Sequence, residues 1–216
     1  MLHYETVDEG TLGLLKQLQS LDILSEMRLV GGTSLALQIG HRKSIDIDLF
    51  GILNVEFDIL IDELKTLGEV VLLKNSKNIH SLLINDIKVD IVNYNYKWLK
   101  NKMTIDNIYF ATIEDIAAMK LNAIMGRGSK KDFIDLYFIL KNYTLSTLID
   151  LYSQKYHDGS IFLVLKSLAY FDDADEQEMP FMFHNTSWQT MKNNIKKALA
   201  DYILPGGYLS SCQYTI

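Results

Sequence analysis

Two aspartates separated by one residue stand in the apolar segment Ser44-Ile45-Asp46-Ile47-Asp48-Leu49-Phe50. The alternation predicts a strand over residues 44–50, with Ile45 and the later apolar residues toward the core and both aspartates on the other face, roughly 6.5–7 Å apart. Two carboxylates held this close repel one another, and a divalent cation with oxygen ligands relieves that repulsion. The alternative is an exposed strand with two solvated acids, although aspartate is a poor strand former. Asp46 and Asp48 are therefore candidate ligands of Mg²⁺.

A third aspartate, Asp90, lies in a second apolar segment with strand spacing, Lys88-Val89-Asp90-Ile91-Val92. Three carboxylates on neighbouring strands form a cup for one or two Mg²⁺ ions. Two ions roughly 3.5–4 Å apart would stabilise the attacking and leaving oxygens of an in-line phosphoryl displacement. We therefore take Asp46, Asp48 and Asp90 as the candidate catalytic and metal-binding residues, with Asp90 also placed to help deprotonate an acceptor hydroxyl.

A glycine pair precedes the first acidic segment. Glycine lets the backbone approach a phosphate closely, and the N-terminus of a following helix offers N–H donors and a favourable dipole. A Gly-Gly pair alone is more often an ordinary turn, so its weight comes from the acidic segment that follows. The candidate ligands of a nucleoside triphosphate here are Gly31, Gly32, Thr33 and Ser34.

Basic residues at three places could contact the same triphosphate. Arg42 stands just before the acidic segment, and arginine commonly neutralises charge in phosphoryl transfer. Lys120 borders the apolar stripe of a predicted helix, so it needs an anionic partner or must extend to solvent. That partner is either a triphosphate, with Arg127 joining the contact, or a structural carboxylate such as Asp132 or Asp135.

Asp132 and Asp135 are three residues apart on a predicted helix and so share one face. They are supporting candidates that orient Lys120 or Arg127 or hold a base of an RNA substrate, and capping of the helix by Asp132 is an equally open alternative. Tyr94 and Tyr96 follow Asp90 closely enough to be candidates for base stacking.

The elements that position these residues follow from hydrophobic periodicity and turn signals. Strands are expected at residues 29–30, 44–50, 69–73, 80–84 and 87–93, and helices at 10–27, 33–39, 55–67, 112–125, 131–140, 145–156, 161–171 and 188–203. Thr33 is expected near the N-cap of its helix and Gly40 at the helix end. Asn85-Asp86 is expected to form a tight turn with positive φ. The fold class is α+β: a mixed sheet with flanking helices over residues 1–110, followed by a helical domain over 111–216.

The composition of the 216 residues is that of a globular protein, with 48% hydrophobic and 22% charged residues. The sequence has no apolar run of about 18 residues and no secretory signal, so we expect no membrane span and a cytoplasmic location. A single cysteine, Cys212, excludes an intrachain disulfide within this sequence. The net charge of −6 argues against sequence-indifferent binding along a nucleic-acid duplex but not against one local basic site. The acidic stretch at residues 172–178 is expected to be a solvated loop.

Taken together, the glycine pair, the Asp-x-Asp strand and the later aspartate resemble the polymerase-β-like nucleotidyltransferase superfamily. The fuller string from Gly31 to Phe50, with His41-Arg42 inside it, resembles the narrower AbiEii/AbiGii toxin family. The resemblance continues in the second half, over about residues 25–140 in all, through Glu114-Asp115-Ile116-Ala117-Ala118-Met119-Lys120, Arg127 and Lys131-Asp132-Phe133-Ile134-Asp135-Leu136. No motif of the family is found after about residue 145.

This resemblance implies a nucleotidyltransferase-type fold and a Mg²⁺-dependent enzyme that transfers a nucleoside monophosphate from a nucleoside triphosphate to an acceptor hydroxyl. It adds Lys131 to the candidate nucleotide-binding residues. It also implies an RNA acceptor, the tRNA 3′ end, and a cognate antitoxin as a partner. Two alternatives stay open: a nucleotidyltransferase acting on an aminoglycoside-like small molecule, which an acidic chain would suit, and a nucleotide- or partner-binding module without catalysis. The intact set of three aspartates counts against the second.

Overall fold

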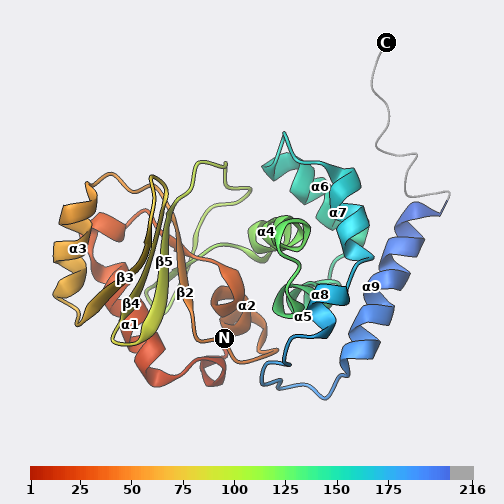
Figure 1. Ribbon diagram of the computed structural model, residues 1–216, viewed down its shortest axis with the longest axis horizontal. Helices are drawn as coiled ribbons and strands as arrows, with labels where there is room; N and C mark the ends of the chain where they lie inside the picture. Colours follow the sequence, from red (N-terminus) through yellow and green to blue (C-terminus); the bar gives the residue numbers. More distant parts are fainter. Residues whose placement is uncertain (205–216) are drawn as a thin grey trace, which may run out of the picture. The chain divides into compact units, whose positions relative to one another are not determined.

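The computed structural model describes residues 1–204, so Cys212 lies outside the described residues (Figure 1). The chain divides into two compact units, Met1–Thr112 and Ile113–Ile216. We describe each unit by itself.

The first unit is built on one mixed seven-stranded sheet with the order β3-β4-β5-β2-β1-β7-β6. Its central pair, β2 and β5, is parallel, as is the β1–β7 pair, whereas β1–β2, β3–β4, β4–β5 and β6–β7 are antiparallel. The strands are β1 (Arg28–Leu29), β2 (Ile47–Gly51), β3 (Val70–Asn75), β4 (Ile79–Ile84), β5 (Ile87–Asn93), β6 (Met103–Ile105) and β7 (Ile108–Phe110). The predicted mixed sheet with flanking helices is confirmed.

Three α-helices accompany this sheet: α1 (Glu9–Ser20), α2 (Gly31–Ile39) and α3 (Phe57–Lys65), with short 3-10 turns at Tyr4–Thr6 and Asp22–Leu24. The side chain of Asp8 caps α1 by accepting a hydrogen bond from the Thr11 backbone N–H at 2.8 Å, a kind of cap that stabilises a helix by about 1 kcal/mol. Buried leucines of α1 and α3 join inward side chains of β2, β4 and β5 in one core. Each fully buried leucine contributes about 1.5–3 kcal/mol relative to an exposed one. Because this core covers one face of β2 and β5, the side chains on the other face are the ones available to a functional site.

Two turns in this unit have the same chemistry, and only one was predicted. Asn85 and Asp86 have φ of 49° and 64°, which confirms the expected tight turn between β4 and β5. Asp106 and Asn107, with φ of 50° and 61°, form the matching turn of the β6–β7 hairpin. The sequence pattern did not predict this hairpin because each strand has only three residues, too few for alternation to stand out.

The second unit is helical in its described part, as expected. Its helices are α4 (Ile113–Gly126), α5 (Lys130–Ile139), α6 (Leu145–Lys155), α7 (Ile161–Leu168), α8 (Asp172–Asp175) and α9 (Trp188–Ile203). Helix α4 packs against α5, α6 and α7. Side-chain oxygens of Thr144, Ser160 and Ser187 cap the N-termini of α6, α7 and α9. Lys155 and Asp115 are both fully buried and form an ion pair at 2.7 Å that joins α6 to α4.

The acidic stretch at residues 172–178 is not a solvated loop throughout, so that prediction was wrong in part. Its first four residues form α8. The carboxylate of Asp175 forms an ion pair with Lys192 at 2.8 Å and accepts a hydrogen bond from the indole N–H of Trp188 at 2.5 Å. These contacts attach α8 to α9 because oppositely charged and hydrogen-bonding groups of the two helices meet there.

Within residues 1–204, no helix has the length and apolar character that crossing a membrane requires.

Candidate active site

The carboxylates of Asp48 and Asp90 are brought together by the register of two central strands. In the parallel β2–β5 pair, Asp48 lies directly opposite Asp90. Their neighbours Ile47, Leu49, Val89 and Ile91 are fully buried, whereas both aspartates are half-buried. Directly opposed residues of neighbouring strands point to the same face and lie about 5 Å apart. The sheet therefore holds two carboxylates side by side on the face opposite the core.

Asp46 is placed differently from the prediction. Strand β2 begins at Ile47, so Asp46 lies in the segment before it, and Ile45 is 60% exposed instead of facing the core. The expected strand over residues 44–50 was wrong at this end because the first three residues have no partner strand that extends alternation to them. Asp46 is positioned through its backbone, since its carbonyl accepts a hydrogen bond from the Thr33 hydroxyl.

Lys88 is a basic residue of this site that was not among the predicted site residues. Its ammonium lies 2.5 Å from Asp90 Oδ2, and Asp90 Oδ1 accepts a hydrogen bond from Ser81 at 2.5 Å. Burial by itself lowers the pKa of Lys88, but the hydrogen bond to Asp90 and the charges of Asp90, Asp48 and Asp46 outweigh it and raise that pKa. All three predicted carboxylates thus act on one cation. The signal in the sequence was its position two residues before Asp90 on the same face of the strand.

Gly31 allows α2 to begin against the Asp48 carboxylate. Its φ is +68°, and a Cβ at this position would overlap Asp48 Oδ2. The helix starts at Gly31 with Val30 as N-cap, so the expected N-cap at Thr33 was wrong. Valine offers no side-chain acceptor, and no side-chain hydrogen bond caps this end. The N–H donors and the helix dipole at this terminus favour a bound anion.

The hydroxyls of Thr33 and Ser34 are buried and already bonded within the protein. Thr33 Oγ1 is 2.9 Å from Ser44 Oγ, and Ser34 Oγ accepts a hydrogen bond from Gln38 at 3.0 Å. Thr33 thereby joins the first turn of α2 to the segment that carries Asp46. In this structure both residues position the site, and their predicted contact with phosphate stays a prediction.

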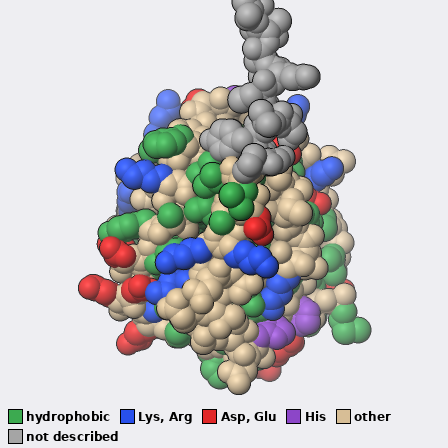
Figure 2. All heavy atoms as spheres, turned by 90° about the vertical axis from the view of Figure 1, so that its right-hand side faces the viewer, with side chains coloured by type: hydrophobic (Ala, Val, Ile, Leu, Met, Phe, Trp, Pro, Cys, Tyr) green, Lys and Arg blue, Asp and Glu red, His purple; other side chains and the backbone are tan. Residues whose placement is uncertain are grey.

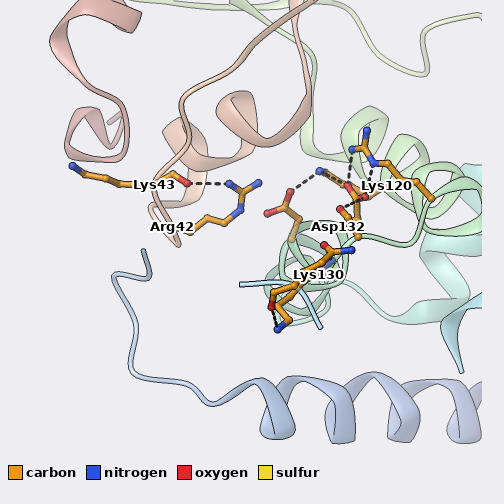
Figure 3. A network of polar contacts seen from close by, with 9 residues as sticks. Arg42, Lys43, Lys120, Lys130 and Asp132 are labelled. Atoms are coloured by element: carbon orange, nitrogen blue, oxygen red, sulfur yellow. Dashed lines mark hydrogen bonds and ion pairs between the residues drawn. The ribbon is translucent and has the colours of Figure 1, made fainter. Parts of the chain in front are cut away.

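Arg42 is 3% exposed and lies against the first turn of α2, where a Cβ on Gly32 would overlap its guanidinium. It donates a hydrogen bond to the Lys43 carbonyl at 3.0 Å, shown in Figure 3. A buried guanidinium beside a glycine and an anion-favouring helix terminus has the chemistry of a phosphate site.

The carboxylates fit a divalent metal by type and by placement. Mg²⁺ prefers oxygen ligands and is usually bound by one or two carboxylates together with water and substrate phosphates, and Asp48 and Asp90 form such a pair. The ion pair between the Lys88 ammonium and Asp90 lies on this same face. No group of three or more His, Cys, Asp or Glu side chains among residues 1–204 is gathered as a complete metal site. Asp48 and Asp90 are thus the paired carboxylates of this face, and Asp46 lies in the segment before β2.

In the second unit, Lys120 is the centre of a buried ionic network. Its ammonium lies 3.0 Å from Asp132 Oδ1 and 2.6 Å from Asp135 Oδ2, and the three side chains are at most 6% exposed. Arg127, whose side chain is 69% exposed, donates two hydrogen bonds to Asp132 at 2.8 and 3.0 Å. Figure 3 shows Lys120 and Asp132 directed toward one another. The sequence left either a triphosphate or a structural carboxylate as the partner of Lys120. In the structure its partners are the carboxylates of Asp132 and Asp135.

The charge state of Asp132 follows from these contacts. Burial would raise the pKa of its carboxyl, but Lys120, Arg127 and the hydroxyl of Ser129 together hold it well below its usual range. Asp132 is therefore ionised at every pH above about 4. Lys131, predicted to contact nucleotide, is exposed, whereas its neighbour Lys130 is buried and donates hydrogen bonds to the carbonyls of Asp175 and Gln177.

With this geometry in place, residues 14–205 match the family described as "Nucleotidyl transferase AbiEii toxin, Type IV TA system". The chain belongs to the AbiEii toxin family. The family establishes a nucleotidyltransferase, the toxin component of a type IV toxin–antitoxin system, for which a nucleoside triphosphate is the substrate and an antitoxin the partner.

The chain is also similar to one relative in sequence and to solved structures in fold. An uncharacterized protein of Aquifex aeolicus (strain VF5) is 34% identical over 195 residues, which cover 88% of this chain and 94% of the relative. JHP933 from Helicobacter pylori has a similar fold, with a TM-score of 0.57 at 18% identity over 90% of this chain and 92% of that one. MenT4, a nucleotidyltransferase toxin from Mycobacterium tuberculosis H37Rv, has a TM-score of 0.50 at 12% identity, covering 88% and 82% of the two chains.

The helical unit of this AbiEii family member also contains a pocket of ≈ 470 Å³. None of the predicted site residues lines it. Figure 2 shows the face on which α9 lies, with basic side chains among apolar ones. The pocket is lined by Tyr137, Leu140, Lys141, Tyr143, Thr144, Leu145, Ser146, Asn194, Lys197, Ala198, Asp201 and Tyr202.

Proposed function

We propose that this AbiEii family enzyme transfers a nucleoside monophosphate to a hydroxyl of an RNA acceptor, the tRNA 3′ end, with Mg²⁺ held by Asp46, Asp48 and Asp90. The observation that carries the metal-binding part is the register that sets Asp48 opposite Asp90 beside Gly31. The RNA acceptor rests on the resemblance described above and on the aromatic and basic residues that follow β5. The cytoplasm, where tRNA is charged, is the proposed place of action.

In the transfer, the acceptor oxygen forms a bond to the α-phosphorus as the bond between that phosphorus and the bridging oxygen of pyrophosphate breaks. A bound divalent ion would supply charge neutralisation to the reacting phosphate oxygens. The chain's own carboxylates hold the site, and Asp90 receives the proton that the acceptor hydroxyl loses. Gly31, Gly32 and the first turn of α2 bind the leaving phosphates through backbone N–H groups, and Arg42 supports their charge.

The proposal does not depend on nucleotide contacts made by Lys120, Arg127 or Lys131. The network around Asp132 and Asp135 gives Lys120 and Arg127 a structural role within the helical unit. Their contact with a triphosphate stays a prediction. Binding would require Lys120 to exchange at least one carboxylate for a phosphate, which is chemically feasible because both partners are oxygen anions.

The deciding experiment incubates the purified protein with each of the four labelled nucleoside triphosphates and bulk tRNA, with Mg²⁺ or with excess EDTA. Label should enter tRNA only with Mg²⁺ and only in the wild type, and Asp48→Asn is the matched control. Label entering tRNA equally in EDTA would exclude the metal. Label transferred to an aminoglycoside but not to RNA would replace the proposed acceptor with a small molecule.

A further inference from the structure

A segment rich in aromatic and basic residues follows β5 directly. Residues 94–102 read Tyr-Asn-Tyr-Lys-Trp-Leu-Lys-Asn-Lys, with three aromatic and three basic side chains and no acidic one, in a chain whose net charge is −6. Figure 1 shows this connection rising beyond the end of β5 before the chain returns to the sheet. A local basic segment in an acidic protein points to a local anionic ligand.

The aromatic rings of this segment form one cluster. Tyr94 lies 5.3 Å from Phe50, 5.5 Å from Tyr96 and 5.2 Å from Trp98, measured between ring centroids. The guanidinium of Arg28 lies over the Trp98 ring at 4.2 Å and donates a hydrogen bond to the Lys100 carbonyl at 2.8 Å. The cluster is therefore supported from within the sheet, because Phe50 belongs to β2 and Arg28 to β1.

The outer part of the segment is accessible. Tyr96 is 44% exposed, and Lys97 and Lys100 are exposed as well, whereas Tyr94 and Trp98 are half-buried. Lys102 is turned back on the protein, where it donates to the Ser25 carbonyl at 3.0 Å and lies over the Tyr109 ring. The segment thus has one exposed aromatic residue and two exposed lysines on a support that packing holds in place.

The aromatic cluster and the candidate phosphate-binding residues lie toward opposite ends of β2. Phe50 is two residues after Asp48 and so lies on the same face, about 7 Å farther along β2. Gly32 and Arg42 lie by the other end of β2, near Ser44. The leaving pyrophosphate and the attacking hydroxyl lie on opposite sides of the α-phosphorus in an in-line displacement. The aromatic cluster is therefore on the acceptor's side.

We propose that residues 94–102 bind the unpaired bases and phosphates at the end of the acceptor RNA, an inference that rests on the proposed function. An unstacked base would stack on Tyr96, above the Tyr94–Trp98 pair, and Lys97 and Lys100 would contact backbone phosphates. Base stacking on aromatic rings tolerates any sequence, and lysines add affinity that depends on salt. A base of the nucleoside triphosphate has the same ring chemistry, so the test must separate the two.

The test measures binding of a labelled single-stranded RNA of about eight nucleotides to the full chain without triphosphate, by fluorescence anisotropy. Tyr96→Ala should weaken binding roughly 10-fold, whereas Trp98→Phe, which keeps an aromatic ring, should bind nearly as wild type. The double variant Lys97→Ala/Lys100→Ala should make the negative slope of log K against log salt shallower by about 1.4. Each single-strand phosphate contact contributes roughly 0.7 to that slope. Lys74→Ala and Tyr170→Ala, exposed residues outside the segment, are the matched controls.

The outcomes are distinguishable. Unchanged RNA affinity in Tyr96→Ala and in the double lysine variant would overturn the inference, and so would an equal loss in the two control variants. A loss of Mg²⁺-triphosphate affinity with unchanged RNA affinity would assign the cluster to the nucleotide's base and overturn it as well. If the wild type labels no RNA at all, the proposed acceptor is wrong. If it labels RNA and Tyr96→Ala does so with an unchanged KM, only the present inference fails.

Discussion

At the scale of single residues, the site is a balance of charge around two strand neighbours. Asp90 contacts Lys88 and Ser81, and Asp48 lies against Gly31. Like charges on neighbouring strands are unfavourable, so the ammonium of Lys88 stabilises the pair of carboxylates. An asparagine has nearly the shape of an aspartate without its charge, which makes it the appropriate replacement here.

We predict that Asp46→Asn and Asp48→Asn each lower nucleotidyl transfer by at least about 100-fold, because metal ligation contributes several kcal/mol to the transition state. The free energy of unfolding should be unchanged or slightly higher, since a repulsive charge is removed. Transfer kinetics and urea denaturation of the same preparations provide the measurement. Near-wild-type transfer by either variant would rule out the proposed metal site.

Asp132 predicts a dependence of stability on pH. Its folded pKa lies below the unfolded value of about 3.9, so the unfolded chain binds more protons near that pH and stability falls as the solution is acidified. The contribution is fully present above the unfolded pKa and is lost as pH falls through the folded pKa. Asp132→Ala should cost about 3–5 kcal/mol at pH 7, because it leaves Lys120 buried with one counter-charge fewer.

Urea denaturation at pH 7 and at pH 3 checks this. The difference between wild type and Asp132→Ala should shrink at pH 3. Asp201→Ala, an exposed position on α9, serves as the control and should be within about 0.5 kcal/mol of wild type at pH 7. A difference between wild type and Asp132→Ala that stays constant from pH 7 to pH 3 would show that packing, and not the charge of Asp132, carries the effect.

At the scale of elements, α2 is held by the residues on either side of it. It begins at a glycine with positive φ against Asp48 and ends at Gly40, with φ of 67°. Thr33 attaches its first turn to the segment before β2. The helix therefore sets the distance between its own N-terminus and the carboxylates, which is the property that a phosphate site needs.

We predict opposite effects of alanine at two glycines. Gly31→Ala should destabilise the fold by about 1–2 kcal/mol through its left-handed backbone alone, and should reduce transfer because the new methyl group displaces the Asp48 carboxylate. Gly13→Ala, inside α1, where the new Cβ would meet no atom within 4 Å apart from its chain neighbours and the helix's own backbone, should stabilise by about 0.5–1 kcal/mol and leave transfer unchanged. Thermal melts and transfer assays of both variants test this. A fully active Gly31→Ala would show that the helix start is not part of the site.

At the scale of the whole molecule, the toxin family predicts a cellular effect. Expression of the wild-type chain in bacteria without its antitoxin should arrest growth, since the proposed modification of the tRNA 3′ end would prevent charging, and Asp48→Asn should relieve the arrest. Growth curves with matched protein levels, and the charged fraction of tRNA, provide the measurement. Arrest by Asp48→Asn as strong as by the wild type would separate toxicity from nucleotidyl transfer.

The sequence by itself determined the parts of this protein that depend on neighbours along the chain. Asn85-Asp86 tolerates positive φ, Gly40 ends α2, and the period of 3.6 residues marks α9 from Trp188 to Ile203, all as predicted. The three aspartates were selected because acids are out of place in apolar strands. The family resemblance supplied the activity, which the match over residues 14–205 then established.

Only the tertiary structure decided which strands pair and which charges meet. It set Asp48 opposite Asp90, placed Asp46 before β2, and brought Lys88 to the carboxylates. It also paired Lys120 with carboxylates, whereas the sequence had left a triphosphate or a carboxylate as its partner. The physical reason is the same in each case: strand register and ion pairing join residues far apart in the chain, and their energies depend on burial and distance, which no local pattern of residues encodes.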